Sequence, residues 1–304
     1  MTNNKPPARN VHGIFLLNKP LGLSSNGALQ RVKRLFQARK AGHTGSLDKL
    51  ACGLLPICLG EATKLSGFLL DADKHYQAVC TLGITTTTGD AEGEILETHS
   101  FDGIQRSQIE QVLTQFTGEI QQIPPMHSAL KYHGQALYKL ARQGKVVERQ
   151  PRPVTIYSLK LQNFSDNLLS LAVHCSKGTY IRTLAEDIGQ ALGCGAHISA
   201  LQRVGVGHYS DMIDLATLEL TAPQGLAALD KLLLPLEDVL VGWPTITLSK
   251  ETVYYIRQGQ PVQIPHAPTE GLVKLMFNHH LLGIGEILED GRLAPKRLLL
   301  RETE

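Results

Sequence analysis

The sequence predicts an α+β protein of two domains, with a large mixed domain followed by a small β-rich one. In the large domain, segments with strand-like alternation are interspersed with segments whose apolar residues recur at helical spacing. After Gly242-Trp243-Pro244 the chain changes to short strands separated by turn residues. A length of 304 residues also favours about two domains.

The composition is that of an ordinary globular protein, with 42% hydrophobic and 19% charged residues. The formal charge of +2 does not identify a nucleic-acid-binding protein, so any basic surface must come from local clusters. No segment has the apolar length of a membrane span, and Met1–Asn10 is a polar tail without a signal-peptide core. Five scattered cysteines, with no CxxC pair, suit the reducing cytoplasm and argue against disulfides or zinc.

The first part of the large domain is predicted to begin with a buried strand at 13–17. A helix with N-cap candidates Ser24-Ser25-Asn26 follows, because Leu29, Val32, Leu35 and Phe36 recur at helical spacing. The next segments are predicted to be buried packing at 54–60, a helix at 62–70, a strand at 74–82 and a loop at 85–94.

The second part is predicted to contain a helix at 107–116, an irregular segment at 123–134, a helix at 135–143 and strands at 154–164 and 168–175. A turn then leads into a helix with the apolar stripe Ile181, Leu184, Ile188 and Leu192. A strand at 198–209 and helical stretches at 215–220 and 224–234 complete this domain. The last sixty residues are predicted to form an all-β module with strands at 245–248, 272–277, 281–289 and 292–300.

The stretch from Gly42 to Gly53 is the strongest candidate for a functional loop. Its three glycines allow positive φ angles and a close approach to a ligand. Asp48 lies between two leucines, which is typical either of a helix cap or of a reactive carboxylate held away from bulk water. The sequence alone leaves both interpretations open.

Two further side chains have the chemistry of a binding site. Arg182 occupies the first turn of a predicted helix, where the macrodipole disfavours a cation, so we expect a specific anionic partner, with Asp48 as a candidate. Tyr76, at a strand start, is either half-buried packing or an aromatic platform for a base.

Cations gather in two places, on the helix before the glycine loop and around the segment at 135–143. Such clusters are typical of a solvated helix face or of a phosphate-binding surface. The first cluster contains Arg31, Lys33, Arg34, Arg39 and Lys40, and the second contains Lys139, Arg142, Lys145, Arg149 and Arg152.

Four motifs in order resemble the bacterial tRNA pseudouridine-55 synthases of the TruB type. They are GIFLLNKPLGLSS from Gly13, AGHTGSLDKLACG from Ala41, LLPICLGEATK from Leu54 and CSKGTYIR from Cys175. The resemblance implies a mixed-sheet pseudouridine synthase catalytic domain at 11–241, preceded by a polar tail at 1–10. It also implies an RNA-contacting insertion at about 123–150 and a PUA-like RNA-binding domain at 242–304.

The same resemblance implies roles for individual residues. Asp48 matches the catalytic nucleophile, Arg182 its pairing arginine and Tyr76 the aromatic stacked on the target uracil. His43 matches a residue near the flipped nucleotide, Tyr180 and Leu201 match further pocket positions, and Lys19 and Pro20 match a motif that supports the loop. The implied enzyme isomerises a T-loop uridine of tRNA. It needs no cofactor, metal, membrane or protein partner, and we expect a cytoplasmic monomer that binds the tRNA T-arm.

The chain departs from the family pattern at Lys49 and Cys52, where proline and threonine are usual. Losing the proline frees φ after the aspartate, and cysteine removes a hydroxyl hydrogen bond. An RNA-binding chaperone with weak or lost catalysis is therefore an alternative if Asp48 is misplaced. A glycoside hydrolase is a weaker one, because no second carboxylate is evident from the sequence.

Overall fold

A computed structural model describes residues 8–299 of the chain. Most of the predicted tail at 1–10 and the last residue of the strand predicted at 292–300 lie outside the described residues. No helix among residues 8–299 is long and apolar enough to cross a membrane.

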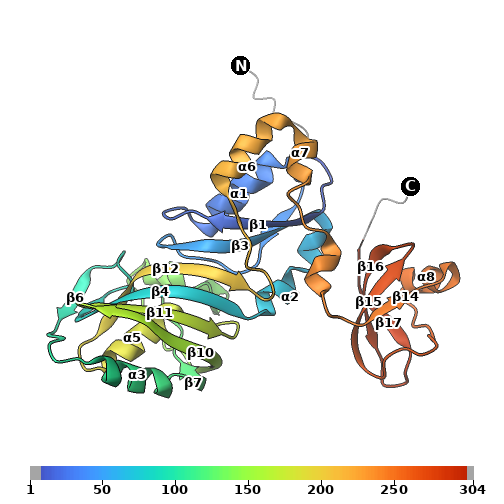
Figure 1. Cartoon of the computed structure of the whole chain (residues 1–304). Coiled ribbons are helices and arrows are strands. Elements are labelled where there is room, and N and C mark those ends of the chain that lie inside the picture. The colour runs from blue at the N-terminus through green and yellow to red at the C-terminus, as the bar shows by residue number, and fades with distance from the viewer. Residues whose placement is uncertain (1–7, 300–304) are drawn as a thin grey trace.

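A nine-stranded mixed sheet forms the centre of the large domain (Figure 1). Its strand order is β13-β1-β3-β12-β4-β11-β10-β7, with β2 beside β3. Strand β12 runs parallel to β3 and antiparallel to β4, so the prediction of a mixed-sheet α+β fold is confirmed. The strands are β1 Gly13–Lys19, β2 Ala41–His43, β3 Ala51–Leu59, β4 Lys74–Leu82, β7 Gly118–Gln122, β10 Arg152–Ser165, β11 Leu168–Cys175, β12 Ala196–Val206 and β13 Ile213–Asp214.

Helices cover the two halves of this sheet separately. In Figure 1, α1, α6 and α7 lie together over the β1–β3 half, whereas α3 and α5 lie against the β4–β10 half. The helices are α1 Ser25–Leu35, α2 Ser66–Asp71, α3 Arg106–Gln115, α4 Leu137–Ala141, α5 Ile181–Ala191, α6 Leu215–Thr221 and α7 Leu226–Asp230. Short 3₁₀ helices occupy Gly60–Lys64, Ala222–Gln224 and Leu236–Leu240.

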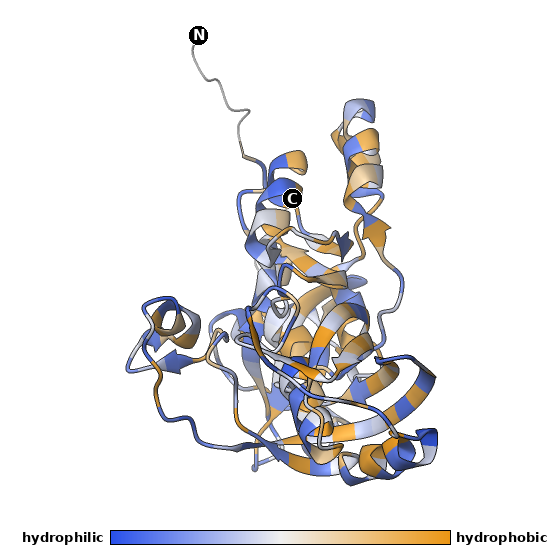
Figure 2. Ribbon diagram, turned by 90° about the vertical axis from the view of Figure 1, so that its left-hand side faces the viewer, coloured by the Kyte–Doolittle hydropathy of each residue, from blue (hydrophilic) through white to orange (hydrophobic). Residues whose placement is uncertain are grey.

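The hydrophobic core follows the predicted alternation. In β11, Leu169, Leu171, Val173 and Cys175 are at most 2% exposed and share a cluster with the apolar stripe of α5. Figure 2 shows the apolar residues concentrated where the helices meet the sheet. A period of two therefore located this strand and its buried face correctly.

Several local predictions were wrong. The helix predicted at 62–70 is broken into a 3₁₀ helix and α2, where the Ser66 hydroxyl bonds back to the carbonyl of Thr63 (2.9 Å). Two hairpins were missed: β5 Ile84–Thr86 with β6 Ile95–Thr98, and β8 Lys131–Tyr132 with β9 Gln135–Ala136. The second hairpin delays the start of α4. These strands are too short to show an alternation pattern.

The sequence analysis predicted an all-β small domain, and this prediction is wrong because the domain also contains a helix. Its four-stranded sheet contains β14 Thr245–Thr247, β15 Gly271–Phe277, β16 His280–Ile287 and β17 Leu293–Leu298. A helix, α8 Lys250–Arg257, interrupts it. The hydroxyl of Ser249 accepts a hydrogen bond from the Thr252 amide (3.3 Å), which is an N-cap visible in the sequence.

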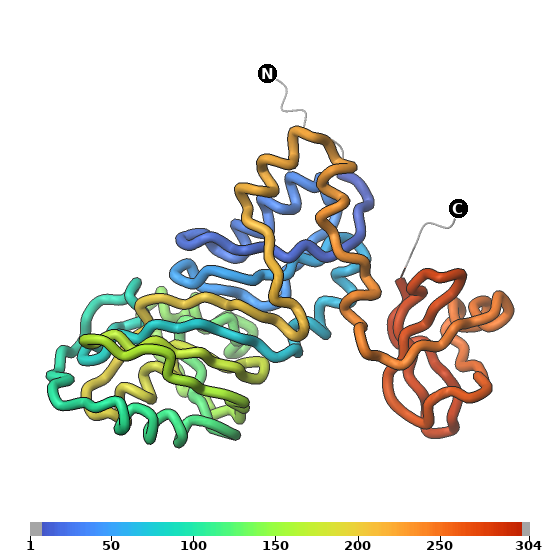
Figure 3. Tube along the Cα trace, viewed as in Figure 1, coloured from blue at the N-terminus to red at the C-terminus, as the bar shows by residue number. Residues whose placement is uncertain are grey.

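The two domains share an interface, although within residues 8–299 the chain passes from one to the other once (Figure 3). Leu65 and Leu69 belong to the same buried cluster as Leu281 and Ile284. The ring of Phe68 meets that of Trp243 edge to face, with centroids 5.0 Å apart. The division into domains at 11–241 and 242–304 stays a prediction. Apolar side chains from both parts pack together at the boundary between them.

Candidate active site

Asp48 lies in the loop that joins β2 to β3, and its neighbours fix the backbone. The Ser25 hydroxyl, at the start of α1, accepts from the Leu47 amide (2.7 Å) and donates to the Leu47 carbonyl (2.8 Å). The Gly22 amide donates to the Lys49 carbonyl (2.8 Å). Contacts on both sides of Asp48 thus hold its Cα in place.

The Asp48 carboxylate does not cap a helix, and the expectation that it is held away from bulk water is wrong, because it is partly exposed. Its side chain is 48% exposed, whereas Leu47 is only 6% exposed and belongs to the core under α1. Burying Leu47 anchors the loop and leaves the next side chain open to solvent. A carboxylate on a fixed backbone is therefore accessible to a large ligand.

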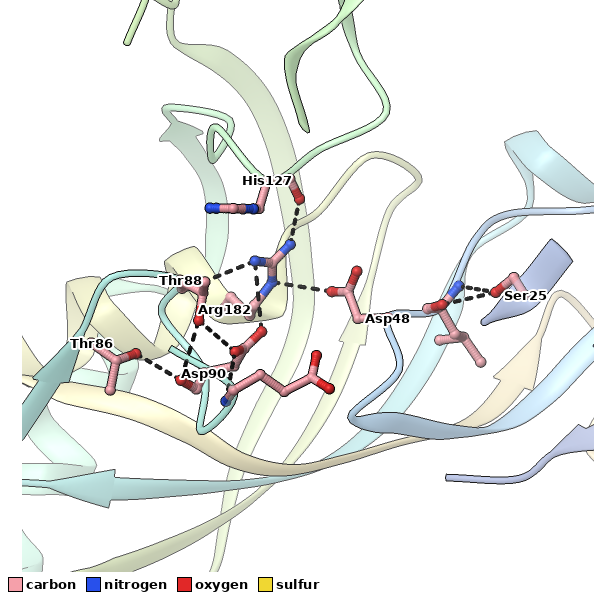
Figure 4. Close-up of polar contacts among 9 residues, drawn as sticks. Ser25, Asp48, Thr86, Thr88, Asp90, His127 and Arg182 are labelled. Atoms are coloured by element: carbon pink, nitrogen blue, oxygen red, sulfur yellow. Dashed lines mark hydrogen bonds and ion pairs between the residues drawn. The ribbon is translucent and has the colours of Figure 1, made fainter. Parts of the chain in front are cut away.

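Arg182, in the first turn of α5, points toward Asp48 and forms an ion pair with it (Figure 4). Its Nε lies 3.1 Å from Asp48 Oδ2, and its side chain is 7% exposed. Its terminal nitrogens donate to the carbonyls of Thr88 (2.9 Å) and His127 (2.7 Å). The expectation that this arginine has an anionic partner is confirmed, and Asp48 is one such partner.

A second carboxylate, Asp90, lies on the other side of Arg182. Its Oδ2 is 3.7 Å from Arg182 Nη1, and the residue is 3% exposed. Its Oδ1 accepts from the Thr88 hydroxyl (2.6 Å) and the Glu92 amide (3.1 Å). The sequence analysis did not select Asp90, because the residues around it predicted only a loop. No feature of the neighbouring sequence indicates that Arg182 reaches this carboxylate.

Tyr76 and Leu201 lie on neighbouring strands, β4 and β12. Leu201 pairs in register with Ala78, and both Tyr76 and Leu201 pack where the cores of the two sheet halves meet. Burial raises the pKa of the Tyr76 hydroxyl, so the ring is neutral at physiological pH. A half-buried neutral ring has the chemistry of a stacking platform.

Tyr180 and His43 complete the set of predicted residues. Tyr180 immediately precedes α5; its backbone exchanges hydrogen bonds with the Gln122 side chain at 3.0 and 3.3 Å, and burial raises its pKa. His43 is half-buried on β2, and its Nδ1 has no partner among residues 8–299. Burial, helped by the charge of Arg203, lowers the pKa of His43, so its imidazole is neutral near pH 7.

Asp48 contacts Arg182 in the presence of both departures from the family pattern. Lys49 is exposed and Cys52, a free thiol, is half-buried at the start of β3. Lys19 is fully buried and donates to the carbonyls of Pro20 (3.0 Å) and Leu23 (2.6 Å). It thereby shapes the turn whose Gly22 amide holds the Asp48 loop.

A cleft of about 650 Å³ opens beside this loop. It is lined by Lys49, Leu50 and Cys52 from the loop and by sheet residues that include Gln77 and Leu201. Among residues 8–299, no group of three or more His, Cys, Asp or Glu side chains is arranged to hold a metal ion.

Comparison with known families gives matches along most of the chain. Residues 33–181 match the TruB family pseudouridylate synthase N-terminal domain, and residues 182–241 match the tRNA pseudouridylate synthase B C-terminal domain. Residues 244–299 match the C-terminal domain of pseudouridine synthase II TruB.

Individual relatives are similar over nearly full length. The tRNA pseudouridine synthase B of Nitrosococcus oceani is 58% identical over 97% of both chains. The protein of the same name from Stutzerimonas stutzeri is 54% identical over 99% of this chain and all of its own. A solved Cbf5-Nop10-Gar1 complex contains a chain with a TM-score of 0.73 and 25% identity, covering 95% of this chain and 85% of that one.

A mixed central sheet with these matches defines the class as the pseudouridine synthases. Relatives more than half identical over nearly the whole chain narrow the assignment further. The chain belongs to the TruB family of pseudouridylate synthases.

Proposed function

We propose that this protein isomerises the T-loop uridine at position 55 of tRNA to pseudouridine, with Asp48 as the nucleophile. The curated relatives named tRNA pseudouridine synthase B support tRNA as the substrate. The observation that carries the catalytic assignment is the exposed Asp48 carboxylate, held 3.1 Å from the buried Arg182.

The reaction breaks the bond between C1′ and N1 and forms a bond between C1′ and C5. Positive charge builds up on the sugar during cleavage, and the electron pair leaves with the uracil. A carboxylate fixed beside the sugar stabilises that charge, either by attacking C1′ or by removing a proton from C2′. The C5 proton is then lost and N1 regains one, so the product is an isomer and needs no redox cofactor.

The target nucleotide must leave its stack, because both N1 and C5 have to reach the sugar in turn. Extrusion costs a few kcal/mol. Tyr76 would offset part of that cost by stacking on the uracil, while Leu201 and Tyr180 would form further walls of the pocket. A neutral His43 would occupy the space near the flipped nucleotide without adding a charge.

The insertion at about 123–150 is the proposed T-arm contact. It carries exposed lysines, and Arg142 lies over the Tyr138 ring at 5.5 Å. The Arg182–His127 hydrogen bond ties its first part directly to the active site. Contacts between these cations and RNA phosphates would recognise a folded RNA arm largely by its shape.

The alternatives receive less support. A glycoside hydrolase needs a second carboxylate to activate water, yet Asp90 is buried and occupied by Thr88, the Glu92 amide and Arg182. A chaperone without catalysis would follow if Lys49 and Cys52 misplaced Asp48, but the carboxylate pairs with Arg182.

The test is single-turnover incubation with unmodified tRNA, followed by detection of the C-glycoside at each uridine. We expect product at position 55 of the T-loop and none in a tRNA with cytidine there. Tight binding without product would identify the chaperone, and free uracil would identify the hydrolase. Product only at another uridine would overturn the assigned position.

A further inference from the structure

Arg203, on β12, is the largest of the fully buried side chains, at 1% exposure. It lies two residues beyond Leu201 and pairs in register with Tyr76, so its side chain points to the same face of the sheet as these two pocket positions. A guanidinium is costly to bury, and a protein retains one where it makes specific contacts.

Two of its hydrogen bonds go to carbonyl oxygens on either side of Asp48, and its side chain also hydrogen-bonds to the Tyr76 side chain. The Arg203 Nε donates to the Leu54 carbonyl (2.7 Å), and Nη2 donates to the Gly45 carbonyl (3.0 Å). Gly45 lies before the aspartate in the loop, and Leu54 lies after it in β3. One rigid, planar group therefore bridges the two ends of the segment that carries Asp48.

The backbone makes room for this arrangement. Gly53 pairs with Arg203 across the parallel β3–β12 contact and has a φ of 100°. A Cβ there would lie 2.2 Å from the Arg203 carbonyl oxygen, so no other residue fits without a shift. The backbone of β12 at Arg203 therefore lies in close contact with the backbone of β3 at Gly53, just after the loop.

The charge of Arg203 is not neutralised by a carboxylate. Among residues 8–299, no Asp or Glu oxygen lies within 4.0 Å of its nitrogens. An ion pair elsewhere in the core therefore does not explain the burial of this side chain. Its donors are directed instead at the Gly45 carbonyl in the loop, at the Leu54 carbonyl in β3 and at the Tyr76 side chain.

We propose that Arg203 is a positioning residue for catalysis, which sets the distance of Asp48 from the substrate sugar by clamping the Gly45 and Leu54 carbonyls. The proposal rests on the proposed function of Asp48. A shift of about 1 Å in a reacting group lowers a rate on the order of a hundredfold. Losing the clamp should therefore slow the reaction while leaving RNA binding, which depends on phosphate contacts, intact.

The experiment compares Arg203→Gln and Arg203→Lys with Lys74→Gln in the full chain. Lys74 is the matched control, because it is also buried, lies on the adjacent strand β4 and donates to the backbone carbonyls of Leu69, Leu70 and Ala72. Those carbonyls lie around α2, away from the loop. Thermal unfolding, the tRNA dissociation constant and the single-turnover rate at saturating tRNA are measured for each folded variant.

We expect Arg203→Gln to lower the saturated rate about a hundredfold with tRNA affinity within about threefold. Arg203→Lys keeps the charge but cannot span both carbonyls, so its rate should fall about tenfold. Lys74→Gln should lose stability and keep its rate. If Arg203→Gln does not fold, the saturated rate of Arg203→Lys is the test of the proposal.

An unchanged saturated rate in Arg203→Lys would overturn the two-carbonyl clamp. So would an equal loss of rate in Lys74→Gln, because the effect would then be one of general stability. If the wild-type protein forms no pseudouridine, the proposed function fails first, and Arg203 would have no catalytic segment to position.

Discussion

The carboxylate of Asp48 and the guanidinium of Arg182 meet 3.1 Å apart, one exposed and the other buried. The contact joins the loop before β3 to the first turn of α5, and Arg182 is itself held by Asp90 and two backbone carbonyls. The fixed guanidinium restricts the orientation of the Asp48 carboxylate, and the carboxylate remains accessible to a substrate.

Replacing Asp48 by asparagine should reduce the single-turnover rate at least about a thousandfold, because it keeps the volume but removes the nucleophile. Affinity for tRNA should stay within about threefold. The matched control is Asp71→Asn, another exposed aspartate, whose Oδ1 lies 2.8 Å from Lys177 Nζ. Residual activity of a tenth of wild type in Asp48→Asn would refute the assignment.

Arg182→Met should destabilise the fold by about 3–5 kcal/mol, because it leaves the buried Asp90 without a counter-charge. Adding Asp90→Asn removes that charge and should restore part of the loss. Denaturant unfolding of both variants measures the difference. Equal stability of the single and double variants would show that Asp90 does not depend on Arg182.

Tyr76→Leu should keep the apolar contact and lose base stacking, which is worth about 1–3 kcal/mol. The expected result is a rate reduced on the order of tenfold to a hundredfold, whereas Tyr76→Phe should keep most of the activity. Saturating single-turnover kinetics provide the measurement. Full activity in Tyr76→Leu would return this ring to a packing role.

His43 should make stability depend on pH. Because burial lowers its pKa in the folded state, the unfolded chain binds more protons below the unfolded pKa of about 6.5. Its stabilising contribution is therefore present above that pH and is lost as the pH falls. In His43→Gln, the drop in unfolding temperature between pH 7.5 and 5.5 should shrink. The same drop in variant and wild type would contradict this.

The cations of the insertion should act through phosphates. Lys139→Gln and Arg142→Gln should each weaken tRNA binding and reduce the slope of log affinity against log salt by up to about one, with little change in the saturated rate. Titrations at several salt concentrations measure the slope. A rate loss at saturating tRNA, with the salt slope unchanged, would instead give these side chains a part in the chemistry.

Local pattern in the sequence determined much of the fold. Strict alternation predicted β11 and its buried face, and helical spacing predicted α1 and α5. These predictions succeed because the period of the apolar residues is set by neighbours in the chain. Helix α8 was missed because the turn residues after Gly242 favoured a module of short strands, and the sequence analysis assigned no element to 250–257.

Family motifs in the sequence predicted Asp48 and its pairing with Arg182, and the predicted pair is present. Only the tertiary structure showed that Asp48 is exposed, that Asp90 shares Arg182, and that Arg203 bridges the loop. All three depend on how segments far apart in the sequence come together in the fold, and the last two depend on where a long arginine side chain ends. A guanidinium reaches several ångströms from its Cα, and its partners are often backbone carbonyls, which every residue has and which therefore leave no signal in the sequence.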